Sequence, residues 1–177
     1  TQEGEEEQII RAALLARRDT PDLLTIIRPR HPERGAAVAA MAGQAPRRAL
    51  GQVLGPDDPV WVCDTLGELG LFFRLASCVY IGNSLPGCNG GGHNPYEPAR
   101  LHCAIATGPL TGNFDEAFAR LAPAVSVVEN AQALADWLPS MLSQPAERHR
   151  LAHRAYALAT AAPELPARPA GQTPVSY

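Results

Sequence analysis

The stretch "CVYIGNSLPGCNGGGHNPYEPA", residues 78–99, joins an apolar run, a glycine-rich loop and the start of a helix. Residues 78–84 begin as a continuous apolar run, which is typical of a strand buried on both faces of a parallel sheet. Asn94 is suited to be an N-cap, Pro95 the first helical residue and Glu97 the third, as in a capping box. The stretch therefore predicts a strand–loop–helix unit.

Three consecutive glycines, Gly90 to Gly92, precede His93 in this loop. They fit three interpretations: a flexible linker, a metal corner with Cys88 and His93, or a loop whose backbone N–H groups meet a ligand oxygen. Open parallel sheets bind ligands outside the carboxyl ends of their strands. We therefore favour the ligand loop, in which Glu97 would either cap the helix or accept the hydroxyls of a ribose.

The same alternation of strand and helix runs through the whole chain. Apolar runs predict strands at residues 23–29, 60–64, 78–84, 103–108 and 125–130, and helical patterns predict helices at 5–18, 33–44, 67–77, 95–102, 114–123, 131–144 and 146–162. This order predicts an α/β fold with a Rossmann-like, doubly wound parallel sheet over residues 1–162. No strand precedes the first helix, so we expect a first strand upstream, in a longer chain.

Composition narrows the function classes. The 177 residues are 46% apolar and 19% charged, with 15 basic and 18 acidic side chains. A formal net charge of -3 argues against nucleic-acid binding through a broad basic surface. No apolar run approaches the ~18 residues of a membrane helix, and the start "TQEGEEEQ" is no signal peptide, so the cytosol is the default expectation. The proline-rich tail, residues 163–177, is expected to be extended or disordered.

Two further strand ends carry unusual chemistry. In "RPRHPERG", residues 28–35, a strand runs into Arg28, Arg30 and His31 before Pro32 opens a helix. Cations at a helix start predict an anion site, although a charged surface turn with an Arg–Glu pair is the alternative.

The second of these strand ends is "DTLGEL", residues 64–69. Thr65 and Glu68 have capping-box spacing, and Gly67 would lie in the first helical turn, where glycine costs helix stability. A glycine there permits the close approach of a flat ligand such as a nucleotide base. Neither feature predicts a metal site, and the four cysteines have no zinc-type spacing.

Taken together, these motifs resemble one family, the 3-deoxy-D-manno-octulosonic acid (Kdo) transferases of lipopolysaccharide synthesis. The resemblance rests on "PRHPERG" (29–35), "DTLGELG" (64–70), "GNSL" (82–85), "GGHNPYEPA" (91–99) and "GPLTGNF" (108–114). The start "TQEGEEE" is similar to the family's Ser-Thr-His-x-Gly-Glu-Glu segment, with Gln2 where histidine is usual. The order of the motifs is kept from residue 1 to about residue 160.

The resemblance implies the C-terminal, sugar-nucleotide-binding half of a GT-B glycosyltransferase, with CMP-Kdo as donor and the lipid A precursor, lipid IVA, as acceptor. It implies CMP contacts from Pro29, Arg30 and His31 at the first strand end, from Leu66, Gly67 and Glu68 at the second, and from Asn94, Pro95, Tyr96 and Glu97 at the third. It implies no metal or other cofactor, and no nucleic-acid partner.

The resemblance also implies that important parts lie outside this chain. The family's acidic general base, acceptor surface and membrane anchor belong to an N-terminal domain, so no catalytic residue is expected in these 177 residues. The whole protein would work at the cytoplasmic face of the inner membrane, whereas this piece would be soluble and inactive. The segment 85–90, "LPGCNG", departs from the family pattern. The alternatives are a non-catalytic nucleotide-binding module, or a related GT-B enzyme or epimerase that uses a UDP-sugar.

Overall fold

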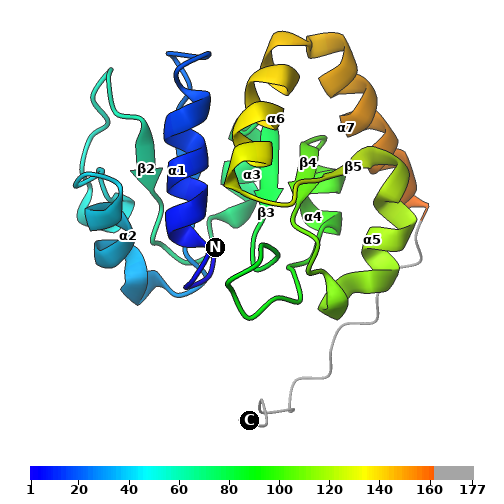
Figure 1. The fold of residues 1–177 in the computed structure, drawn as a ribbon, viewed down its shortest axis with the longest axis horizontal. Coiled ribbons are helices and arrows are strands. Elements are labelled where there is room, and N and C mark those ends of the chain that lie inside the picture. The colour runs from blue at the N-terminus through cyan, green and yellow to red at the C-terminus, as the bar shows by residue number, and fades with distance from the viewer. Residues whose placement is uncertain (162–177) are drawn as a thin grey trace, which may run out of the picture.

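The computed structural model describes residues 1–161, so the predicted tail lies outside the described residues. Its strands all fall inside the predicted runs: β1 (Thr25–Ile27), β2 (Val60–Val62), β3 (Cys78–Ile81), β4 (Ala104–Thr107) and β5 (Val125–Val127). Its α-helices are α1 (Glu6–Ala16), α2 (Gly35–Met41), α3 (Leu69–Leu75), α4 (Tyr96–Arg100), α5 (Asp115–Leu121), α6 (Ala131–Ser143) and α7 (Pro145–Thr160) (Figure 1). Short 3-10 turns are η1 (Pro32–Arg34), η2 (Arg48–Leu50), η3 (Gly112–Phe114) and η4 (Ala122–Ala124).

All paired strands are parallel, as the continuous apolar runs predicted, but they form two sheets rather than one. β1 pairs with β2, while β4 lies between β3 and β5. In a doubly wound sheet the strand before the first helix lies at the centre, between the positions that β1 and β3 occupy here. The absence of a strand at that position within residues 1–161 explains the split.

Thr1 lies at the carboxyl end of that position. Its amino group donates to the Arg28 carbonyl at 2.8 Å, and its own carbonyl accepts from the Arg30 N–H, also at 2.8 Å. On the other side, a β-carbon placed on Gly82, directly after β3, would lie 3.1 Å from the Thr1 α-carbon. The residue that leads into α1 therefore connects the ends of β1 and β3.

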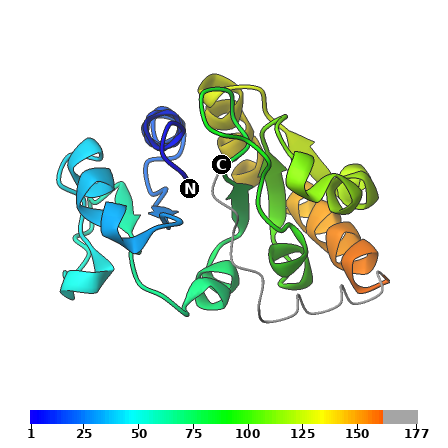
Figure 2. The same cartoon turned by 90° about the horizontal axis from the view of Figure 1, so that it is seen from below.

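Helices cover both faces of the strands (Figure 2). On one face, α1 and α2 pack on β1 and β2, and α1 also meets α6 over Ala106 of β4. On the other face, α4, α5 and α7 pack on β3 and β4 through a core that includes Ile105, Phe118 and Leu121. The sheet of β3, β4 and β5 thus has helices on both faces, so its inner strand β4 can offer polar groups to a ligand only at its end.

None of the helices within residues 1–161 is both long and apolar enough to cross a membrane.

Candidate functional site

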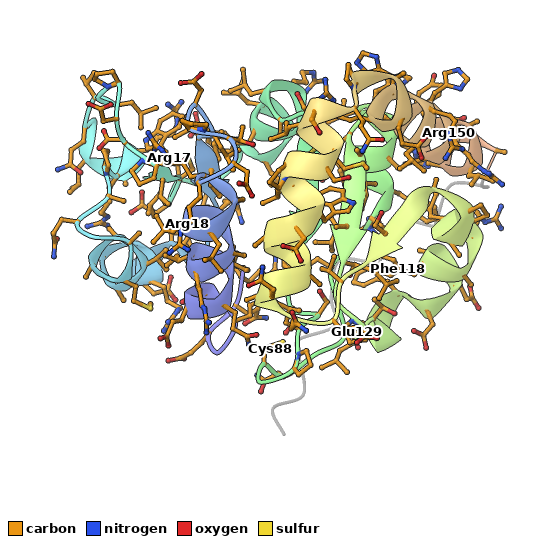
Figure 3. The ribbon with its side chains drawn as sticks, turned by 45° about the horizontal axis from the view of Figure 1, so that its top comes forward. Arg17, Arg18, Cys88, Phe118, Glu129 and Arg150 are labelled. Carbon is orange, nitrogen blue, oxygen red and sulfur yellow. The ribbon has the colours of Figure 1, made fainter. Side chains whose placement is uncertain are left out.

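The three strand ends singled out in the sequence lie at one edge of the molecule. They follow β1, β2 and β3, and the carboxyl ends of parallel strands meet at the same edge. The loop after β3 and the N-terminal end of α1 lie side by side there, linked by a 2.8 Å hydrogen bond from the Gln8 side chain to the Pro86 carbonyl (Figure 1). Cys88 in this loop and Glu129 after β5 mark the same edge in Figure 3.

At the first strand end, Pro29 is buried whereas Arg30 and His31 are exposed. The predicted helix does not start at Pro32: a 3-10 turn occupies Pro32–Arg34, and α2 begins only at Gly35. An Arg–Glu ion pair does form, but it uses Arg34, which donates to the buried Glu6 at 2.6 Å. Arg30 makes no ion pair within the described residues, so it is available to bind an anion.

The second strand end differs from the predicted capping box. Helix α3 begins at Leu69, and Gly67 lies before it in a left-handed turn with φ of 79°. The Glu68 carboxylate accepts from the Thr65 hydroxyl and from the Arg48 guanidinium instead of capping the helix. The Arg48 bond, helped by Thr65, lowers the pKa of Glu68 to about 2. The Glu68 side chain is therefore held by the protein, while Leu66 beside it is 74% exposed.

Arg48, which the sequence analysis did not single out, belongs to this second strand end. Its guanidinium carbon lies 5.5 Å from the centre of the Trp61 ring and 5.8 Å from that of Phe72. Its Nε donates to Glu68 at 2.7 Å. Stacking on two aromatic rings restricts the guanidinium, so Arg48 fixes the position of Glu68.

A buried carboxylate joins the first two strand ends. Asp64 accepts from Arg47 at 2.7 and 2.8 Å and from the Ala49 N–H at 3.0 Å. Burial opposes its ionisation, but these bonds outweigh burial and hold the pKa of Asp64 below its usual value. Its carboxylate occupies the space that a β-carbon would need if residue 35 were not glycine. The loops after β1 and β2 are thus packed directly on each other.

We predicted that backbone N–H groups of the glycine-rich loop after β3 would be free to meet a ligand. Two of these groups instead form hydrogen bonds within the protein. The Gly91 N–H donates to the Leu110 carbonyl at 3.0 Å, and the Gly92 N–H donates to the Asn83 carbonyl at 2.8 Å. The Gly91 carbonyl accepts from the Asn113 N–H at 2.9 Å, and a β-carbon on Gly91 would overlap the Asn113 side chain. The ligand-contact role predicted for these N–H groups is therefore wrong for Gly91 and Gly92, which serve to pack the loop against residues 110–113.

The residues after the loop form the predicted helix, which starts one residue later than predicted and is shorter. Helix α4 begins at Tyr96, and the Asn94 side chain accepts from the Tyr96 N–H at 2.9 Å. Pro95 and Tyr96 are buried, whereas Asn94 and Glu97 are exposed. A β-carbon placed on Gly70 at the start of α3 would lie 3.6 Å from Glu97 Oε1. Glu97 thus connects the second and third strand ends.

The structure places His93 close enough to Arg28, which belongs to another strand end, for their charges to interact. Burial, reinforced by the positive charges of the Thr1 amino group, Arg30 and Arg28, lowers the pKa of His93 to about 4. His93 Nε2 and Arg28 Nε are buried and have no hydrogen-bond partner within the described residues. Sequence alone could not bring the two together, because they belong to different strand ends whose distance depends on the sheet.

Two other features of this edge have separate explanations. The Cys88 thiol donates to the Leu85 carbonyl at 2.9 Å, and no three metal-ligating side chains cluster within residues 1–161. An open hollow of about 330 Å³ lies between α1 and α6. It is lined by Glu7, Gln8, Arg11, Asn130, Ala131 and Gln132, and it includes no residue of the three strand ends.

Comparison with known proteins gives a consistent result. No family model matches the chain. It is 34% identical to a 3-deoxy-D-manno-octulosonic acid transferase of Haemophilus influenzae and 35% identical to that of Bordetella pertussis, over 88% and 89% of its own length. It spans only 38% and 39% of those relatives.

Solved structures match as well. The chain superposes with a TM-score of 0.82 and 31% identity on the C-terminal CMP-Kdo binding domain of WaaA from Acinetobacter baumannii, covering 89% of this chain and 84% of that one. It shares the fold of the C-terminal domain of a group 1 glycosyl transferase (LpcC) from Francisella tularensis, with a TM-score of 0.66 and 19% identity. The chain belongs to the Kdo transferase family and corresponds to the C-terminal domain of its members.

Proposed function

We propose that this domain binds CMP-Kdo and that the full-length protein transfers Kdo from it to the lipid A precursor, lipid IVA. The observation that carries the proposal is the meeting of three strand ends at one edge, which holds two arginines, Arg28 and Arg30, without a carboxylate partner within the described residues. Neither arginine makes an ion pair within residues 1–161, and the one ion-pair contact of the His31 ring there is with the exposed Glu33. The related domain from Acinetobacter baumannii binds CMP-Kdo by its own description, which supports the same donor here.

The donor contacts are proposed from exposure and bonding at the three strand ends. Arg30 and His31, with Arg28 and His93 added, would face the phosphate, and the buried Pro29 would shape the base site. Leu66 and the Gly67 backbone would contact CMP, while Glu68 is held by Arg48 and lines the site.

The third strand end would complete the donor site from the other side. Asn94 and Glu97 are exposed and would reach the ribose, because a carboxylate can accept hydrogen bonds from both ribose hydroxyls. Pro95 and Tyr96 are buried and would hold the backbone between Asn94 and Glu97 in place.

The proposed chemistry is an inverting displacement. A carboxylate base, expected in the part of the protein outside these 177 residues, would take the proton of an acceptor hydroxyl. That oxygen would attack the anomeric carbon of Kdo while the bond to the CMP phosphate oxygen breaks. The phosphate gains a negative charge as it leaves, so Arg28, Arg30, His31 and His93 would stabilise the transition state more than the bound donor.

The acceptor and the place of action belong to the same proposal. We infer that the acceptor surface and a membrane anchor lie in the remainder of the protein, which would act at the cytoplasmic face of the inner membrane. The 177-residue chain alone would then bind nucleotide without transferring sugar.

A transfer assay tests the proposal. Full-length protein is incubated with lipid IVA and either CMP-Kdo or a UDP-sugar, and the mass of the lipid product is measured by mass spectrometry. The expected product is lipid IVA enlarged by one or more Kdo units, formed only with CMP-Kdo. Transfer from the UDP-sugar would indicate a different GT-B enzyme, and nucleotide binding without any transfer would indicate a non-catalytic module.

A further inference from the structure

The loop after β3 is tied to its own strand by one side chain, Asn83. Asn83 is 5% exposed and has a left-handed backbone with φ of 60°, which asparagine adopts more readily than most residues. Its side-chain Nδ2 donates to the Gly90 carbonyl, and its own carbonyl accepts from the Gly92 N–H at 2.8 Å. A single residue therefore holds the loop on both sides of Gly91.

The orientation of the Asn83 amide follows from chemistry. The Gly90 carbonyl can only accept, so the nitrogen of the amide must face it. The other atom, Oδ1, is buried and has no hydrogen-bond partner within the described residues. A buried amide oxygen without a partner costs free energy. The hydrogen bond from Nδ2 to the Gly90 carbonyl offsets this cost.

Asn83 is itself held by a buried carboxylate. Glu5 is fully buried and accepts from the Asn83 N–H, from the Ser84 N–H at 3.2 Å and from the Gln2 N–H at 3.2 Å. Ser84 in turn accepts from the Gly108 N–H at 2.8 Å. Through Glu5 and Ser84, the backbone at Asn83 is thus bonded to the start of α1 and to the residue after β4, and these bonds restrict the motion of Asn83.

The loop held by Asn83 leads directly into the donor site. His93 follows Gly92 and lies where Arg28 and Arg30 act on its charge, and Asn94 and Glu97 come next. We propose that Asn83 is a positioning residue that fixes the loop 86–92. Residues 93–97 are then already in the conformation that binds the nucleotide. This inference rests on the proposed donor site, because a mobile loop would lose conformational entropy when the donor binds and would so weaken donor binding.

Asn83→Gly separates the side chain from the backbone, because glycine keeps the left-handed conformation and removes only the amide. The matched control is Asn89→Gly, an exposed asparagine of the same loop for which the structure shows no side-chain hydrogen bond. CMP affinity of the 177-residue chain is measured by calorimetry, and hydrogen exchange is measured for the loop 86–92 and for β4.

For Asn83→Gly we expect faster exchange in residues 86–92, unchanged exchange in β4 and a CMP Kd about tenfold higher, as for the loss of one buried hydrogen bond. Asn89→Gly should leave the CMP Kd within about twofold of wild type. Asn83→Asp keeps size and left-handed tolerance but sets an acceptor against the Gly90 carbonyl, so it should also loosen the loop.

Three outcomes are distinguishable. Equal loop exchange and equal CMP affinity in wild type and Asn83→Gly would overturn the inference. Faster exchange of β4 together with the loop would also overturn it, since Asn83 would then stabilise the whole domain. A wild-type chain that does not bind CMP would contradict the proposed donor site, while the loop exchange would still report on Asn83.

Discussion

The carboxylate of Asp64, directly after β2, fills the space that a β-carbon on Gly35, the first residue of α2, would need. Asp64 is held there by Arg47 and the Ala49 N–H. Gly35 has an ordinary helical conformation, with φ of -50°. It is therefore the space above Gly35, and not its backbone conformation, that requires glycine.

Gly35→Ala should destabilise the domain although alanine favours helices. The new methyl group would displace the buried Asp64 carboxylate, and such overpacking typically costs about 1–3 kcal/mol. Thermal or urea unfolding measures the effect. Gly112→Ala is the control, because no atom lies within 4 Å of the position of its β-carbon. A Gly35→Ala chain as stable as wild type would show that Asp64 can move away freely.

Arg48→Met should raise the pKa of Glu68. The substitution keeps an apolar side chain on Trp61 and Phe72 but removes the bond that lowers this pKa to about 2. A carboxylate whose pKa is lowered in the fold stabilises the protein fully at a pH above its pKa in the unfolded chain, which is near 4.5. This contribution is lost as the pH falls toward the folded-state pKa of about 2. The stability difference between wild type and Arg48→Met should therefore shrink across this window, and NMR titration of Glu68 checks the shift. A Glu68 that titrates identically in both proteins would exclude the ion pair in solution.

His93 should make the domain less stable in mild acid. Its pKa is lowered to about 4 in the fold, against an ordinary value of 6.5. Between these values the unfolded chain binds a proton that the folded chain does not, so the free energy of unfolding falls as the pH decreases from 6.5 to 4. His93→Gln should flatten this part of the pH profile.

CMP should also raise the pKa of His93, because a phosphate anion nearby favours the protonated ring. NMR titration of the His93 ring with and without CMP measures this directly. An unchanged ring pKa in the presence of saturating CMP would place the phosphate away from His93.

Arg30→Ala in the full-length protein should lower kcat/KM for CMP-Kdo by roughly a hundredfold, the usual effect of removing a charge-stabilising donor from a transition state. Arg18→Ala serves as the control, since Arg18 is exposed and follows the C-terminal end of α1, away from the strand ends. Near-normal kinetics of Arg30→Ala with CMP-Kdo would remove Arg30 from the donor site.

Much of the fold was predictable from local sequence. The continuous apolar runs located all the described strands and their parallel direction, because the inner strand β4 is buried along its length and its neighbours are partly buried. The split of the sheet was not predictable in this way, because it depends on which strands are neighbours. Helix starts were the least accurate part: α2 begins at Gly35, since a 3-10 turn occupies Pro32–Arg34, and α4 begins one residue after Pro95.

The candidate residues lie at the predicted edge, but several of their hydrogen bonds were not predicted. Arg30, His31, Leu66, Asn94 and Glu97 are exposed at the expected edge, which follows from the rule for strand ends. Glu68 and the glycine loop were assigned ligand contacts, yet their polar groups are used by Asn83, a few residues before the loop, and by Arg48 and Leu110, about twenty residues away. Capping-box spacing could not reveal these partners, because long-range contacts leave no local pattern.

The most direct test of the donor site is the change in backbone amide NMR shifts of the 177-residue chain on titration with CMP. We predict saturable shifts confined to the three strand ends, residues 28–35, 64–70 and 91–97, with little change in α7. Shifts centred on the hollow between α1 and α6, or no saturable shifts at millimolar CMP, would contradict the assignment of these strand ends as the donor site.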